Sequence, residues 1–197
     1  MRNDAEYMRV RLGDVADIRS GYPFRGAVPE ITDGDAAVVQ IKNVDTEAGI
    51  DWTGLVQTEL TGRRKPDWLQ SRDILFTARG NRNIAVYVDS APVNAVCAPQ
   101  FFLVRLKSDQ QALPQFVAWQ INQPNAQKYF AQSAEGTLIT SIRRKVLEEM
   151  PLHLPSGEKQ ELVVRLCEAA QHEKNLLTEL IENRKKQLNV VTKNLLG

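Results

Sequence analysis

Two polar loops in the middle of the chain carry the side chains best suited to chemistry with a nucleic acid. Arg63, Arg64 and Lys65 lie together in the first, and Arg79-Gly80-Asn81-Arg82-Asn83 separates two apolar segments. Arg can bind guanine and Asn can bind adenine through paired hydrogen bonds, so a loop that offers both suits the reading of bases. Lys and Arg elsewhere suit phosphate contacts, which set position. The alternative, that both loops are ordinary solvated turns, stays open.

Patterns for catalysis are weak. Pro66-Asp67 could begin a metal-carboxylate nuclease motif, but neither Asp-x-Lys nor Glu-x-Lys occurs in the chain. No two glycines are separated by a single residue, so the dinucleotide-binding fingerprint is missing. His153 and His172 lack metal-ligand spacing to each other or to the cysteines. We therefore expect no catalytic residue, no metal site and no cofactor in this chain.

Composition indicates a globular domain of ordinary kind. The chain has 197 residues, of which 43% are hydrophobic, and a net charge of +1. No apolar run approaches the ~20 residues that cross a bilayer, and the expected location is the cytoplasm. We expect Cys97 and Cys167 to be small core residues in a reducing compartment, without a disulfide.

Charge is distributed unevenly. Glu30 to Glu59 holds seven acids against one base, and Leu60 to Lys107 holds eight bases against three acids. The low net charge argues against a uniformly basic surface, but the basic segment permits a polyanionic partner. Two solvated faces that neutralise each other would give the same pattern.

The elements that must position these loops are of both types. Short apolar runs bounded by turn residues predict strands at Ala36–Val44, Ile74–Thr77, Ile84–Val88 and Phe101–Leu106. A helical face is expected in Val10–Ile18. From Leu113 onward, apolar residues recur at helical spacing, which predicts helices broken at Gln123-Pro124. A short helix opened by Ser141 and a strand at Leu152–Leu154 are expected to follow. The expected fold is α+β: a β-rich curled sheet with small helices.

One long helix follows. Neither Gly nor Pro interrupts Glu158 through Leu196, so we expect a compact domain in residues 1–155 and one long helix in residues 156–197. Apolar side chains recur every seven residues in two rows, which together are Val163, Ala170, Leu177 and Val191, with Arg184 at the fourth position, and Ile181, Leu188 and Leu195. Such a stripe predicts a partner helix, with a dimer seam favoured over a helix folded back on its own domain.

Three segments resemble a known family. Val10-x-Leu12-Gly13-Asp14-Val15-Ala16-x-Ile18-x-Ser20-Gly21-x-Pro23-Phe24-Arg25, Gln40-Ile41-Lys42-Asn43-Val44 and Asp73-Ile74-Leu75-Phe76-Thr77-Ala78-Arg79-Gly80 resemble target recognition domains from specificity subunits of type I restriction-modification systems. The Gly136-Thr137 turn, Pro151-Leu152-x-Leu154-Pro155 and Glu158-Lys159-Gln160 resemble that family's junction between domain and spacer helix. The chain departs from the family at Arg72, where glycine is usual.

The resemblance implies a non-catalytic DNA-binding subunit that reads one half of a bipartite target. Full specificity subunits carry two such domains and two helices, so the chain resembles a half-subunit that would pair with a second copy. The implied partners are double-stranded DNA, methyltransferase subunits and, in some systems, a restriction subunit. S-adenosylmethionine, Mg²⁺ and ATP are expected only on those partners. The candidate DNA contacts are Tyr22, Arg25, Lys42, Arg63, Arg64, Lys65, Arg79, Asn81, Arg82, Asn83, Thr137 and Arg143.

Two other functions remain open from the sequence. A stand-alone DNA-binding regulator would bind its site tightly without a methyltransferase. A helix-mediated scaffold or inhibitor that resembles half of a specificity subunit would abolish methylation instead of directing it. Neither the target sequence nor its spacing can be read from the loops.

Overall fold

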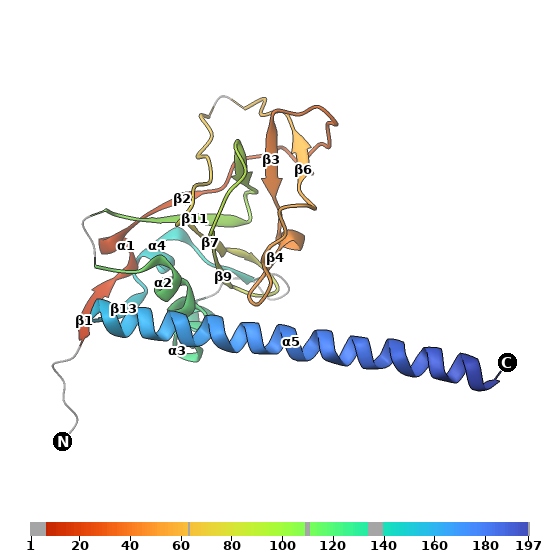
Figure 1. Ribbon diagram of the computed structural model, residues 1–197. Helices are drawn as coiled ribbons and strands as arrows, with labels where there is room; N and C mark the ends of the chain where they lie inside the picture. The colour runs from red at the N-terminus through yellow and green to blue at the C-terminus, as the bar shows by residue number, and fades with distance from the viewer. Residues whose placement is uncertain (1–6, 63, 109–110, 134–139, 197) are drawn as a thin grey trace, which may run out of the picture.

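The computed structural model describes residues 7–62, 64–108, 111–133 and 140–196, and it has an α+β fold with a long C-terminal helix (Figure 1). This confirms the fold class expected from the sequence. At the centre lies a four-stranded antiparallel sheet in the order β2-β11-β7-β9. Its strands are β2 (Ala16–Ser20), β7 (Ile74–Thr77), β9 (Ala85–Tyr87) and β11 (Phe101–Leu106).

Each face of this sheet is buried in a different hydrophobic cluster. Successive side chains of a strand point to opposite faces, so neighbouring residues join different clusters. In β7, Ile74 and Phe76 belong to one hydrophobic cluster and Leu75 to another; in β11, Val104 and Leu103 divide in the same way. The first cluster is covered by α2 (Pro114–Ile121) and α3 (Pro124–Ser133), whose buried Phe116 and Phe130 pack into it. The helices break at Gln123-Pro124, as expected.

The second cluster fills the space between this sheet and a three-stranded sheet of order β10-β3-β6. These strands are β3 (Ala36–Val39), β6 (Val56–Thr58) and β10 (Ala95–Cys97). The sequence predicted one strand over Ala36–Val44, but the chain leaves the sheet after Val39. A short 3-10 helix η1 (Ile41–Asn43) follows, and then the small hairpin of β4 (Val44–Asp45) and β5 (Gly49–Ile50).

The start and end of the domain pair with each other. β1 (Tyr7–Arg11) runs antiparallel to β13 (Pro151–Pro155). The helix expected over Val10–Ile18 is a single turn, α1 (Leu12–Val15), and that prediction was wrong beyond it. Leu12 and Val15 are buried as a helical face requires, but the following residues pair with β11, so the sheet hydrogen bonds override the helical period.

The short helix near residue 141 also differs from expectation. Ser141 does not open it; it lies in β12 (Thr140–Ser141), which pairs with β8 (Arg79–Gly80). The helix α4 (Arg144–Glu148) starts three residues later, with Arg143 at its N-cap and no side-chain cap hydrogen bond. Pairing with β8 holds Ser141 extended.

The last element, α5 (Gly157–Leu196), is a continuous helix of 40 residues (Figure 1). Its first turn is fixed by Gln160, which is fully buried, accepts a hydrogen bond from the Leu113 amide and donates to the Gln111 and Pro155 carbonyls. Val163 and Val164 pack against the first cluster. Residues 172–196 are all exposed, so the second half of α5 extends away from the domain.

Candidate nucleic-acid interface

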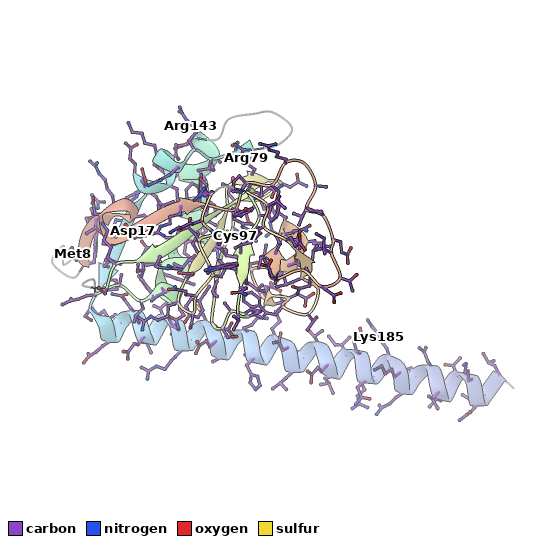
Figure 2. The ribbon with its side chains drawn as sticks, turned by 90° about the horizontal axis from the view of Figure 1, so that it is seen from above. Met8, Asp17, Arg79, Cys97, Arg143 and Lys185 are labelled. Carbon is purple, nitrogen blue, oxygen red and sulfur yellow. The ribbon has the colours of Figure 1, made fainter. Side chains whose placement is uncertain are left out.

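Segments far apart in the sequence meet at one edge of the domain. Arg79 pairs with Ser141 in the β8–β12 ladder, and the Ile142 amide donates to the Ala78 carbonyl at 2.8 Å. The amides of Ala78 and Arg79 both donate to the Gln100 carbonyl, at 2.8 and 3.2 Å. Figure 2 shows Arg79 and Arg143 together at this edge, on the side of the domain away from α5. We call it the β8–β12 edge.

The helix η1 adds Lys42 to this edge. A Cβ placed on Gly80 would lie 3.5 Å from Ile41 Cδ1, so η1 lies against the loop. Asn43 fixes η1: its Oδ1 accepts from the Gln40 amide at 3.0 Å and its Nδ2 donates to the Gly54 carbonyl at 3.0 Å. Buried Asn43 thus anchors η1 in the domain while the neighbouring Lys42 stays exposed.

The loop between β7 and β9 carries the exposed side chains of Arg79, Asn81 and Arg82. Its ends are joined by a hydrogen bond from the Thr77 amide to the Ile84 carbonyl. Asn83 is only 8% exposed; its Nδ2 donates to the Thr77 carbonyl at 2.9 Å. Asn83 therefore supports the loop from within, and the DNA contact predicted for it stays a prediction.

The charge of Arg82 acts on the nearby carboxylate of Asp45. The pKa of Asp45 is lowered by hydrogen bonds from the Ala48 and Glu47 amides, and further by the nearby charges of Arg82 and Lys174. A hollow lined by Thr46, Asn81 and Arg82 separates the β4–β5 hairpin from α3. The positive charge of Arg82 is thus partly balanced within the domain.

Arg64 is exposed, but hydrogen bonds within the domain fix its side chain. It donates to Asp67 at 2.8 Å and to the Ser20 carbonyl at 3.2 Å, while Arg19 binds the other Asp67 oxygen at 2.6 Å. Burial alone would raise the pKa of the Asp67 carboxyl, but the hydrogen bonds from these two guanidinium groups lower it below its usual range. Lys65 beside it is exposed.

Tyr22 is also a structural residue. It is 5% exposed, stacks edge-on against Phe24 with ring centroids 5.0 Å apart, and accepts a hydrogen bond from the Gly62 amide at 2.8 Å. Its ring lines a surface cavity of about 730 Å³ together with the exposed Arg25. The hydroxyl of Tyr22 thus closes the Gly62 loop, and direct contact of Tyr22 with DNA stays a prediction.

Features of other protein classes are sparse in the described residues. Among them, no group of three or more His, Cys, Asp or Glu side chains is placed to hold a metal ion. Within the same ranges, no helix has the length and apolar character to cross a membrane. Cys97 is buried and burial raises its pKa to about 12. Cys167 is exposed on α5, which corrects its assignment to the core.

A sequence comparison decides the family. Residues 5–190 match the model of the type I restriction modification DNA specificity domain. The chain belongs to this family. No curated protein is similar enough in sequence to match it.

Solved structures share the specificity-domain fold. The S subunit of a type I restriction-modification system from M. genitalium superposes with a TM-score of 0.61 at 16% identity, over 94% of this chain and 44% of that one. The HsdS subunit from Thermoanaerobacter tengcongensis gives 0.66 at 17% identity, over 95% and 48%. A chain from a study of complex assembly and conformational transition of the type I R-M system gives 0.65 at 15% identity, over 97% and 45%. The chain thus spans less than half the length of each.

Within this specificity domain, the predicted contact residues divide into groups. Lys42, Arg79 and Arg143 gather at the β8–β12 edge, and Arg25, Lys65, Asn81 and Arg82 are also exposed. Tyr22, Arg64 and Asn83 have structural hydrogen bonds instead. Arg63 and Thr137 lie outside the described residues.

Sequence reasoning missed Gln100. Its carbonyl accepts hydrogen bonds from the amides of Ala78 and Arg79, and its exposed side chain lines a cavity of about 310 Å³ with Lys42. It follows Ala98-Pro99 in the turn before β11, and a polar residue in a proline turn was the available signal.

Proposed function

We propose that this chain reads one half of a two-part DNA target and positions DNA methyltransferase subunits on it. The observation that carries the proposal is the β8–β12 edge, where three segments of a DNA specificity domain bring exposed Lys42, Arg79 and Arg143 onto one surface. Arg79 and the exposed Asn81 have the donors and acceptors that read bases in the major groove. Lys42, Lys65 and Arg143 suit phosphates.

Catalysis belongs to the partners in this proposal. The chain supplies recognition and spacing, the methyltransferase subunits hold S-adenosylmethionine, and a translocating endonuclease subunit with Mg²⁺ and ATP joins in systems that cut. Binding of DNA by the chain alone is weak and falls steeply with salt, because phosphate contacts release counterions.

α5 is the proposed spacer. Its exposed half is too long and too apolar along one side to be stable alone in water, so it pairs with the same helix of a second copy. Support comes from Leu177, Ile181, Leu188, Val191 and Leu195, each at least 53% exposed. Val163, predicted for this seam, is half-buried against its own domain instead. A dimer would present the same half-site contact twice, as an inverted repeat.

The decisive experiment is to express the chain with the methyltransferase of its own system and to map every methylated base in the host genome. The expected result is a split inverted repeat with a fixed gap. Arg79→Ala should relax one position in each half-site, whereas Arg165→Ala removes an equal charge from α5 and should leave the motif unchanged. Methylation without sequence preference, or a motif indifferent to Arg79, would overturn the proposal.

A further inference from the structure

The apolar row on α5 extends further toward the domain than the heptad positions alone indicate. With 3.6 residues per turn, Leu162, Leu166 and Ala170 lie on the same stripe as Leu177 and the residues after it, within an arc of about 100°. Leu162 and Leu166 are 50% and 61% exposed although α5 contacts the domain in this region. The domain contacts through Gln160 and Val164 lie about 110° and 150° around the helix from the middle of the stripe, and Val163, which also packs against the domain, lies at the edge of the stripe.

Two charged residues interrupt this stripe, and they have opposite signs. Glu173 lies between Ala170 and Leu177, and Arg184 lies between Ile181 and Leu188; both are exposed. A charge in an apolar helix seam is costly unless a partner neutralises it. It then favours the one register in which the partner is met.

An antiparallel second copy meets this condition at one register. If Glu173 faces Arg184 of the other copy, then Arg184 faces Glu173 in return, because the arrangement is two-fold. The same alignment places Leu162 opposite Leu195 and Leu166 opposite Val191, and it places small Ala170 opposite Gln187, next to large Leu188. Leu177 and Ile181 meet around the axis.

Charge along the whole helix favours the same orientation. Glu158 to Glu182 contains six acids and three bases, whereas residues 184–197 contain four bases and no acid. Antiparallel helices place the acidic half of one copy against the basic half of the other, and parallel helices would oppose like charges. Lys185 lies on the half that extends beyond the domain (Figure 2).

We infer that a reciprocal Glu173–Arg184 ion pair between two antiparallel copies of α5 fixes the register of the dimer. This inference rests on the pairing of α5 proposed above and names the residues that set it. A shift by one heptad would move each domain ~10 Å along the rod. It would also leave four charges without partners, so the pair determines how far apart the two reading edges stand.

Charge reversal tests the pair in the full-length chain. Glu173→Arg and Arg184→Glu each place like charges opposite one another twice per dimer and should weaken dimerisation at least about tenfold in analytical ultracentrifugation. The double variant exchanges the signs and should restore affinity to within about threefold of wild type. Glu179→Arg, on the opposite side of α5, is the matched control and should change little. Circular dichroism checks that each variant keeps its helix.

Cross-linking tests the register itself, in a Cys167→Ser background. Chains with Leu166→Cys mixed with chains with Val191→Cys should form a covalent heterodimer on mild oxidation. Leu166→Cys mixed with Leu177→Cys should stay uncross-linked, since the two positions would lie ~20 Å apart along the rod.

The outcomes separate the two proposals. A wild-type chain that stays monomeric at high concentration, or that pairs only with a methyltransferase helix, overturns both the dimer and its register. A stable dimer in which the double reversal gives no rescue, or in which Leu166 and Val191 variants do not cross-link, overturns the register alone. Rescue together with the expected cross-link supports it.

Discussion

The side-chain amide of Asn83 donates to the backbone carbonyl of Thr77 across 2.9 Å and closes the loop that presents Arg79 and Asn81. A second tie comes from Gln127 of α3, whose Nε2 donates to the Asn83 carbonyl at 2.9 Å. The loop is thus supported from below by buried polar contacts while its tip stays exposed. Two asparagines of one loop have different tasks, which mutation can separate.

Asn83→Ala should destabilise the fold by about 1–2 kcal/mol, because the Thr77 carbonyl loses its buried donor. Asn81→Ala should leave stability within about 0.5 kcal/mol, since the side chain is exposed. Urea denaturation of both variants measures the difference. In methylation mapping, Asn81→Ala should broaden one base position. Equal stability losses in the two variants would contradict this division.

Arg79 and Lys65 should differ in how they affect DNA binding with the methyltransferase present. Arg79→Ala should cost about 1–3 kcal/mol on the target and relax a single position. Lys65→Ala should weaken all duplexes alike and reduce the slope of log affinity against log salt by about one. Fluorescence anisotropy at several salt concentrations, on target and scrambled duplexes, separates the two. A Lys65 variant that discriminates between the duplexes less well than wild type would refute the phosphate role.

The paired charges of Arg105 and Asp73 should be needed for stability. Arg105 binds both oxygens of Asp73, at 2.7 and 2.8 Å, and this hydrogen bonding raises the pKa of Arg105. Arg105→Met would leave the Asp73 carboxylate, which is 1% exposed, without its cation. We expect a loss of about 3 kcal/mol by thermal or chemical unfolding. Arg105→Lys keeps the charge but not the forked geometry and should fall between. An unchanged midpoint for Arg105→Met would rule this out.

Arg72→Gly should stabilise the protein. Arg72 has a φ of 76°, so the turn before β7 has the left-handed conformation that glycine adopts most readily. A side chain costs roughly 1–2 kcal/mol there, which is partly offset by the greater freedom of glycine in the unfolded chain. The expected net gain is about 0.5–1 kcal/mol in urea. Arg72→Ala, which keeps a Cβ, is the control and should gain little.

The two cysteines should react differently with a thiol reagent. Cys97 is buried with a pKa of about 12, and Cys167 is exposed, although partial burial also raises its pKa. At pH 8 the native protein should titrate one thiol with Ellman's reagent and the denatured protein two. Cys167→Ser should remove the native signal. Two fast-reacting thiols in the native state would show that the second cluster opens readily.

Elements determined by their own sequence could be predicted, whereas elements determined by pairing with distant strands could not. The bounds of β7 and β11 followed from apolar runs with turn residues at each end, and the break at Pro124 followed from the missing amide of proline. The helix expected over Val10–Ile18 failed because pairing with a distant strand decides β2. Such long-range pairing leaves little trace in the local period.

The candidate site was less readable for a similar reason. Residue type indicated Arg79, Asn81 and Asn83 equally, and only the packing of α3 and Thr77 under the loop separates exposed Asn81 from buried Asn83. The structural hydrogen bonds of Tyr22 and Arg64 could not be predicted because their partners, Gly62 and Asp67, come from loops of no regular pattern. The sequence shows which side chains could bind DNA, and tertiary contacts determine which of them are exposed.

The antiparallel pairing of β1 with β13 brings the two ends of the reading domain side by side at the root of α5. The polypeptide between Leu12 and Met150 therefore begins and ends beside this pair of strands. A different domain could therefore be grafted onto the same helix by exchanging that stretch, provided that both strands are kept and that the new domain renews the contacts of Gln160, Val163 and Val164. Target choice and spacing would then be separate properties of one polypeptide, each open to redesign without disturbing the other.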